Sequence, residues 1–282
     1  MRRGYSRLQL PCGQCIGCRL ERSRQWAVRI LHEASLHELS CFVTLTYDDA
    51  HVPEGGSLRK RHFQDFMRKL RKVSAFPIRY FHCGEYGELL KRPHYHAILF
   101  GVDFADKKLW KQSAAGPLFR SEILEKLWPF GFSSIGAVTF ESACYVARYC
   151  VKKVSGKKAV RHYESVDRET GVITRLLPEY VTMSLKPGIG HDWFKCFSSD
   201  VFPSDEVIVN AKAAKPPRYY EKLHTVVDAA VMEGIKARRL AKADARFDDN
   251  SPARLRVKRE VAQARLNLKR RSLDALGNDG GV

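Results

Sequence analysis

Pro77-Ile-Arg-Tyr-Phe-His-Cys83 and His94-Tyr-His-Ala-Ile-Leu-Phe100 are the two stretches of this chain that decide its fold. Both are rich in β-branched and aromatic residues, which favour strands. The segment between them, residues 84–93, contains Gly and Pro and is typical of a turn. We therefore predict that the two stretches form an antiparallel hairpin.

Working outward from this hairpin, the apolar patterning predicts further strands and helices. The predicted strands cover 41–47 and 132–139, and the predicted helices cover 19–39, 57–73 with Ser57 as N-cap, 121–127 and 141–154. The resulting order is β–α–β–β–α–β–α, which is the split pattern of ferredoxin-like or RRM-like α+β domains with an additional helix. Two short strands are expected around residues 169–171.

Length and charge divide the chain and suggest its partner. We expect a Cys-rich entry and amphipathic helix in 1–40, a catalytic or binding domain in 41–200, and a basic, mostly helical or partly disordered region in 201–282. The net charge is +18 and the isoelectric point about 9.7, which predicts a polyanionic partner such as nucleic acid. No apolar run is long enough to span a membrane and no signal core is visible, so we expect no membrane partner and residence where the chain is made.

The pattern His94-Tyr-His96 suggests a divalent-metal site. Residues i and i+2 of a strand project from one face, so the two imidazoles should point the same way with Tyr95 opposite. Glu85, at the end of the preceding strand, is the best-placed carboxylate to complete the site, with Glu88 and Asp48 as weaker alternatives. Mg or Mn would act there as a Lewis acid on a phosphate. For the pattern alone, two structural polar residues on a half-buried strand are the commoner interpretation.

Tyr145 and Tyr149 are four residues apart in a predicted helix and so lie one turn apart on one face. A phenol next to a cation and a metal-bound phosphate is a candidate nucleophile. Lys152 and Lys153 follow on the next turn, where they could contact a backbone phosphate or the attacking oxygen. Aromatic pairs at this spacing are more often core residues, and that interpretation stays open.

Cys12, Cys15 and Cys18 form a C-x2-C-x2-C pattern that suits zinc or an iron–sulfur cluster. A fourth ligand does not follow at the usual spacing and would have to come from Cys41, Cys83 or a histidine. Plain reduced thiols are the alternative. The other cysteines stand singly, as is typical of a reducing compartment.

Taken together, three segments resemble the HUH-endonuclease superfamily of rolling-circle replication initiators. They are Phe42-Val-Thr-Leu-Thr-Tyr47, Gly84-Glu-Tyr-Gly87 leading to Arg92-Pro-His-Tyr-His96, and Tyr145-Val-Ala-Arg-Tyr149 with Lys152-Lys153. The resemblance is strongest to initiators of gokushovirus-type microviruses, which are single-stranded-DNA bacteriophages. The N-terminal cysteine segment and Met183-Ser-Leu-Lys-Pro-Gly-Ile-Gly190 resemble the same group.

This resemblance implies a central antiparallel sheet of about five strands and a metal held by His94, His96 and Glu85. It also implies nicking and rejoining of single-stranded or supercoiled phage origin DNA through a 5′-phosphotyrosine, with Tyr145 and Tyr149 alternating. Arg92, Arg148, Lys152 and Lys153 would contact the nucleic acid. Host helicase and polymerase would be partners, and the cytoplasm of the bacterial host would be the location.

Two other functions remain open from the sequence. A non-catalytic RRM-like nucleic-acid-binding protein would use exposed aromatic residues on its central strands, and Tyr80 and Tyr95 could serve that purpose. A single-strand DNA transposase of the same superfamily is the other, disfavoured by the second tyrosine.

Overall fold

The computed structural model describes residues 11–87, 91–113, 116–152, 154, 156, 159–166 and 170–273, with side chains except those of 149–152 and 269–273. Its centre is an antiparallel sheet in the order β4-β5-β6-β1-β3-β2-β9. The strands are β1 (Ser40–Tyr47), β2 (Arg79–Tyr86), β3 (Pro93–Phe100), β4 (Lys108–Ser113), β5 (Gly116–Arg120), β6 (Gly131–Gly136) and β9 (Tyr180–Met183). The predicted α+β fold and the β2–β3 hairpin are confirmed.

The sheet has seven strands, so the expected number of about five is too small. The hairpin of β4 and β5 extends one side of the sheet beyond β6, and β9 pairs with β2 on the other side. The sequence of β4 and β5 carries Gly116 and Pro117 and lacks a regular alternation, so its pattern does not predict strands.

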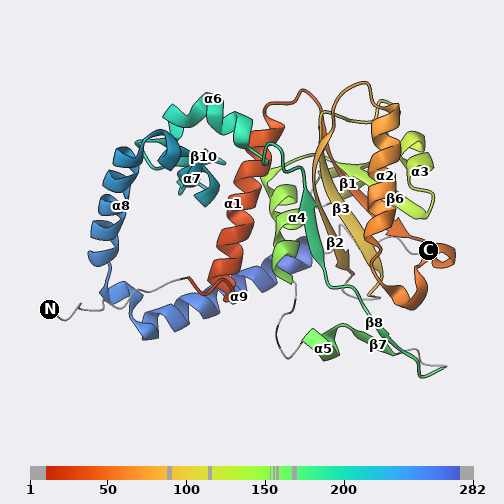
Figure 1. The fold of residues 1–282 in the computed structure, drawn as a ribbon. Helices are drawn as coiled ribbons and strands as arrows, with labels where there is room; N and C mark the ends of the chain where they lie inside the picture. The colour runs from red at the N-terminus through yellow and green to blue at the C-terminus, as the bar shows by residue number, and fades with distance from the viewer. Residues whose placement is uncertain are drawn as a thin grey trace.

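Helices cover both faces of this sheet (Figure 1). On one face α2 (Lys60–Val73) and α3 (Glu122–Leu127) pack on an aromatic core that includes Tyr47, Phe66, Tyr95 and Trp128. On the other face α1 (Ile16–Ala34) and α4 (Phe140–Lys152) pack on a core that includes Phe81 and Ile98. We refer to these as the α2/α3 face and the α1/α4 face.

The start of α2 differs from the prediction. The helix begins at Lys60 with Arg59 as N-cap, and the hydroxyl of Ser57 instead accepts a hydrogen bond from the Leu177 backbone N–H at 3.0 Å. A tertiary contact with a distant segment therefore overrides the local capping signal.

The C-terminal part builds a third core on the outer side of α1. Val28 of α1 packs with Phe194 of α6 (His191–Val201), Tyr220 of α7 (Arg218–Val227) and Ile235 of α8 (Ala229–Asp244). The helix α9 (Pro252–Leu273) then returns beneath α1 and contacts it (Figure 1). As a result, α1 lies between the sheet and the C-terminal helices.

Short elements complete the described chain. They are 3-10 turns at Asp49–His51, Glu54–Gly56 and Asp248–Asn250, the helix α5 (Ala159–His162), and the small hairpins β7 (Glu164–Val166) with β8 (Ile173–Arg175) and β10 (Val207–Val209) with β11 (Lys212–Ala214). The β7–β8 pair is the excursion expected around residues 169–171. Within the described residues, no helix has both the length and the apolar character needed to cross a bilayer.

Candidate metal and tyrosine site

The two histidines of β3 lie on the α1/α4 face. His94 is paired with Thr46 of β1 and Glu85 of β2, and His96 is paired with Thr44 of β1. Directly paired residues of antiparallel strands share a face, so these side chains form two adjacent polar rows. Tyr95 points to the opposite face, as the alternation along a strand predicts.

Two threonines orient the imidazoles. The hydroxyl of Thr44 is 3.0 Å from Nδ1 of His96, and the hydroxyl of Thr46 is 2.9 Å from Nδ1 of His94. Each contact turns Nε2 of its ring away from β1, which is the arrangement that metal-ligating histidines use when a neighbouring group fixes the ring. Sequence reasoning missed this role of the threonines. The alternation Thr44-Leu-Thr46 matching His94-Tyr-His96 was the available signal.

Glu85 lies beside His96. Its Oε1 is 2.8 Å from Nε2 of His96, and both side chains belong to almost fully buried residues, at 3% and 2% exposed. Adjacent ligands of an octahedral ion with bonds of about 2.1 Å are about 3.0 Å apart, so a shared ion could replace the shared proton with little movement. Nitrogen and carboxylate oxygen are also a suitable donor set for Mn or a later divalent metal. The residues present therefore fit a divalent ion.

Gly87 leaves space for His94. A Cβ atom at this position would lie 2.8 Å from Nε2 and 3.2 Å from Cδ2 of the imidazole. The turn that brings Gly87 there is closed by a hydrogen bond from its N–H to the carbonyl of Arg92 at 2.9 Å. A side chain at residue 87 would consequently displace the imidazole.

Tyr145 brings a phenol from α4 to the same place. Its hydroxyl is 3.5 Å from Oε1 of Glu85, and its ring meets that of His96 edge to face with centroids 5.0 Å apart. Phe42 of β1 packs edge to face with Tyr145 and stacks on His96, which fixes the two rings relative to each other. The structure thus brings together Tyr145, Glu85 and the histidine pair.

The other predicted residues of α4 are placed only in part. Tyr149 and Lys152 belong to the helix, so Tyr149 lies one turn after Tyr145, but the side chains of both residues lie outside the described part. Lys153 lies outside the described residues altogether. Arg148 is half-buried on the same helix.

Three further predicted residues have other surroundings. The guanidinium of Arg92 donates to the carbonyl of Tyr47 at 2.8 Å and forms an ion pair with Asp49. Asp48, an alternative ligand, instead accepts from His51 at the start of a 3-10 turn, and this contact lowers its pKa. Glu88, the other alternative, lies outside the described residues.

The site is covered on its inner side and more open on its outer side. His96 and Glu85 are buried, and Tyr145 is 6% exposed. In the outer row, His94 and Thr46 are half-buried and Phe132 of β6, paired with Thr46, is 43% exposed. A phosphate would therefore reach these groups from the side of His94.

The tyrosines considered for an RRM-like platform do not form one. Tyr95 is fully buried on the α2/α3 face, where its hydroxyl accepts from the Arg59 N–H at 2.8 Å and contacts the hydroxyl of Tyr47 at 2.9 Å. Burial raises the pKa of Tyr95. Tyr80 is half-buried against the same core. Neither ring is available for a base to stack on.

The cysteine cluster is a separate group at the start of α1. The ligand atoms of Cys12, Cys15 and Cys18 lie within 4.8 Å of one another. Hydrogen bonds from backbone N–H groups, that of Cys15 foremost, lower the pKa of the Cys12 thiol to about 7. Cys41 and Cys83, considered as a fourth ligand, are instead buried in the cores on the two faces of the sheet.

Comparisons with known proteins place the chain in a family. Residues 40–154 match the family of replication-associated proteins that is named after the phage protein ORF2. The replication-associated protein VP4 of Bdellovibrio phage phiMH2K is 33% identical over 75% of this chain and 66% of the relative. The replication-associated protein ORF2 of Spiroplasma virus 4 is 32% identical over 76% of this chain and 67% of the relative.

The chain belongs to this family of phage replication-associated proteins. The family resemblance drawn from the sequence is thereby confirmed. A third relative, the replication-associated protein ORF4 of Chlamydia phage 1, is 29% identical over 76% of this chain and 53% of its own length. The chain spans about two thirds or less of the length of these relatives, and no solved structure matches it.

Proposed function

We propose that this protein is a metal-dependent nickase and ligase that cuts one strand of phage origin DNA and later rejoins it, thereby starting and ending rolling-circle replication. The observation that carries the proposal is the position of the Tyr145 hydroxyl, 3.5 Å from the carboxylate that also contacts His96. A nucleophile and a donor set for a divalent ion are thus within reach of one phosphate.

Each group has a chemical task in this proposal. A divalent ion held by His94, His96 and Glu85 supplies Lewis-acid stabilisation of the scissile phosphate. The Tyr145 oxygen attacks phosphorus, the bond to the 3′-oxygen breaks, and a 5′-phosphotyrosine forms. The phenol proton passes toward Oε1 of Glu85, and the leaving 3′-oxygen takes up a proton from water. Because the phosphotyrosine keeps the phosphodiester energy, attack by a 3′-hydroxyl reverses the step and rejoins the strand.

Tyr149 provides the second nucleophile in the proposal. It lies one helical turn from Tyr145 in α4. While Tyr145 holds one 5′ end, Tyr149 attacks the regenerated origin, so that one round of replication can end as the next begins.

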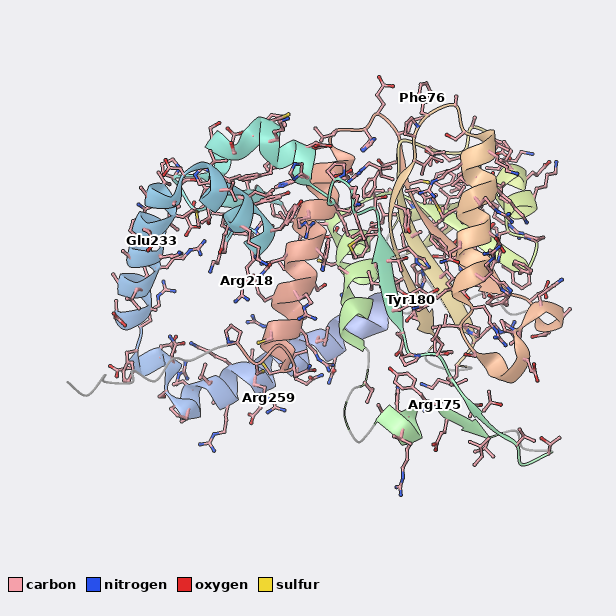
Figure 2. All side chains as sticks on the ribbon, viewed as in Figure 1. Phe76, Arg175, Tyr180, Arg218, Glu233 and Arg259 are labelled. Carbon is pink, nitrogen blue, oxygen red and sulfur yellow. The ribbon has the colours of Figure 1, made fainter. Side chains whose placement is uncertain are left out.

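Affinity for DNA rests mainly on the basic surface. The segment from 212 to 274 contains 17 Lys and Arg residues and 8 acidic residues. They are spread over several helices, as Arg218 on α7 and Arg259 on α9 illustrate (Figure 2). Binding should therefore weaken steeply with salt and be largely independent of the metal.

Covalent capture tests the proposal. A labelled origin oligonucleotide incubated with Mn or Mg should yield a denaturant-stable adduct with the natural protein, and none with the Tyr145→Phe/Tyr149→Phe double variant. Replacing His94 or His96 by Ala should abolish cleavage and leave salt-sensitive binding intact. Cleavage by the double tyrosine variant would overturn the proposal.

A further inference from the structure

The loop before α1 gathers three thiols that the sheet site does not use. The sulfur atoms of Cys12 and Cys18 are 3.9 Å apart, and the Cys15 ligand atom lies within 4.8 Å of both. The backbone N–H of Cys15 donates to Sγ of Cys12 at 3.2 Å, which closes the loop from 12 to 15. Gly13 permits this turn because its φ is +72°, a value that L side chains rarely adopt.

The spacing of the sulfurs favours a single ion. In a tetrahedral zinc site with Zn–S bonds of about 2.3 Å, two sulfurs are about 3.8 Å apart. A disulfide needs its sulfurs at about 2.05 Å. An iron–sulfur cluster attaches each thiolate to a different iron, and therefore needs the sulfurs further apart than a single ion does. The observed separation agrees with the first of these arrangements.

The position of the cluster also favours an ion with thiolate ligands. Cys15 is the N-cap of α1 but makes no side-chain capping bond, and the first turn contains no acidic residue. Arg19 and Arg22 add positive charge to a helix end that already favours negative charge. Three thiolates on one divalent cation carry a net negative charge, which complements both.

We propose that Cys12, Cys15 and Cys18 bind one zinc ion, with water at the fourth position, and that this ion caps α1. Among the residues that the structure describes, no further His, Cys, Asp or Glu ligand atom joins these three. The proposal concerns a site distinct from that of His94 and His96 and does not depend on the proposed nicking reaction.

The ion would act on the fold through α1. This helix packs against α4, and the hydroxyl of its Ser23 donates to the carbonyl of Cys144 at 3.1 Å. Cys144 is the residue before Tyr145, so the zinc-capped helix supports the backbone of the candidate nucleophile. The other side of α1 carries the core of the C-terminal helices. Zinc removal should therefore loosen α1 and with it both of its packing partners.

Metal analysis of the purified full-length protein tests the proposal. Elemental analysis should find about one zinc ion per chain, lost in the Cys12→Ser, Cys15→Ser and Cys18→Ser variants. Cys196→Ser is the matched control because Cys196 is also an exposed free thiol but lies on α6. It should keep its zinc. Loss of zinc should lower the thermal midpoint of the three variants by several degrees relative to the control.

X-ray absorption at the zinc edge of the natural protein keeps the test valid if a variant fails to fold. Three sulfurs and one oxygen ligand support the proposal. Four sulfurs would contradict the open fourth position. Iron with the visible absorption of a cluster, a disulfide between two of the three cysteines, or zinc retained by all three serine variants would overturn the site itself.

Discussion

The two faces of the central sheet use similar residues for different ends. Strand β3 sends Tyr95 into the α2/α3 face, where hydroxyl and aromatic contacts with Tyr47 and Trp128 complete a closed core. The same strand sends His94 and His96 to the α1/α4 face, where threonines and a carboxylate surround the rings. Strand alternation alone separates the core from the candidate site.

His82 and His96 make the comparison sharper. Both rings are buried and both contact a threonine through Nδ1, since His82 lies 2.9 Å from the hydroxyl of Thr182. His82 stacks on Phe63 of α2, and among the described residues its Nε2 has no hydrogen-bond partner. Burial lowers its pKa well below the usual value. His96 differs in having Glu85 at Nε2. The carboxylate, and not burial, distinguishes a candidate ligand from a core residue.

The same substitution on the two faces should give the largest contrast. His96→Phe should abolish metal binding and reduce nicking by about 100-fold or more, because a ligand is lost. His82→Phe keeps the ring that stacks on Phe63 and should retain both properties. Calorimetric Mn titration and a nicking assay measure the effects. Equal losses in the two variants would show that the two faces do not differ in function.

A methyl group at Gly87 should disturb the site without touching either core. In Gly87→Ala the new Cβ would meet Nε2 of His94, so we expect metal affinity to fall by about 10- to 100-fold. Gly234→Ala on α8 is the control, since a Cβ there meets nothing within 4 Å. Unchanged Mn affinity of Gly87→Ala in a calorimetric titration would place the ion elsewhere.

The threonines provide a smaller matched test. Thr44→Val removes the hydroxyl that orients His96 and should weaken metal binding by about 10-fold. Thr182→Val removes the corresponding contact of His82 and should leave metal binding unchanged. Each variant should lose about 1 kcal/mol of unfolding free energy in denaturant titrations, because a hydrogen bond to a buried ring is lost. Equal metal affinities would mean that Thr44 has only a structural role.

Buried imidazoles without a carboxylate should also make the fold sensitive to acid. Burial lowers the pKa of His32, which stacks on Trp193, to about 4. Because the unfolded value is about 6.5, the unfolded state binds more protons between about pH 6.5 and 4, and stability falls as the pH falls through this window. His32→Phe should reduce that fall by up to about 3 kcal/mol. Denaturant titrations at several pH values check this, and an unchanged slope would refute it.

Much of the fold could be predicted from local sequence. The strands β1, β2, β3 and β6 and the helices α2, α3 and α4 follow from hydrophobic periodicity and β-branched residues, with boundaries shifted by a few residues. The β9 strand and the displaced start of α2 could not be predicted, because both depend on contacts between residues far apart in the chain.

The site was predictable where chemistry is written in residue types. His94, His96, Glu85 and Tyr145 were identified by spacing and resemblance. Thr44 and Thr46 were missed because their role depends on the register of β1 against β3, which the sequence does not state directly.

One measurement tests the central claim most directly. Crystals of the protein with an uncleaved origin-type oligonucleotide and Mn, in the Tyr145→Phe/Tyr149→Phe background, should show one anomalous manganese peak. We predict that this peak contacts Nε2 of His94, Nε2 of His96 and the carboxylate of Glu85, with a phosphate between it and the ring at position 145 or 149. A manganese ion away from these three residues, or a phosphate far from both rings, would contradict the account.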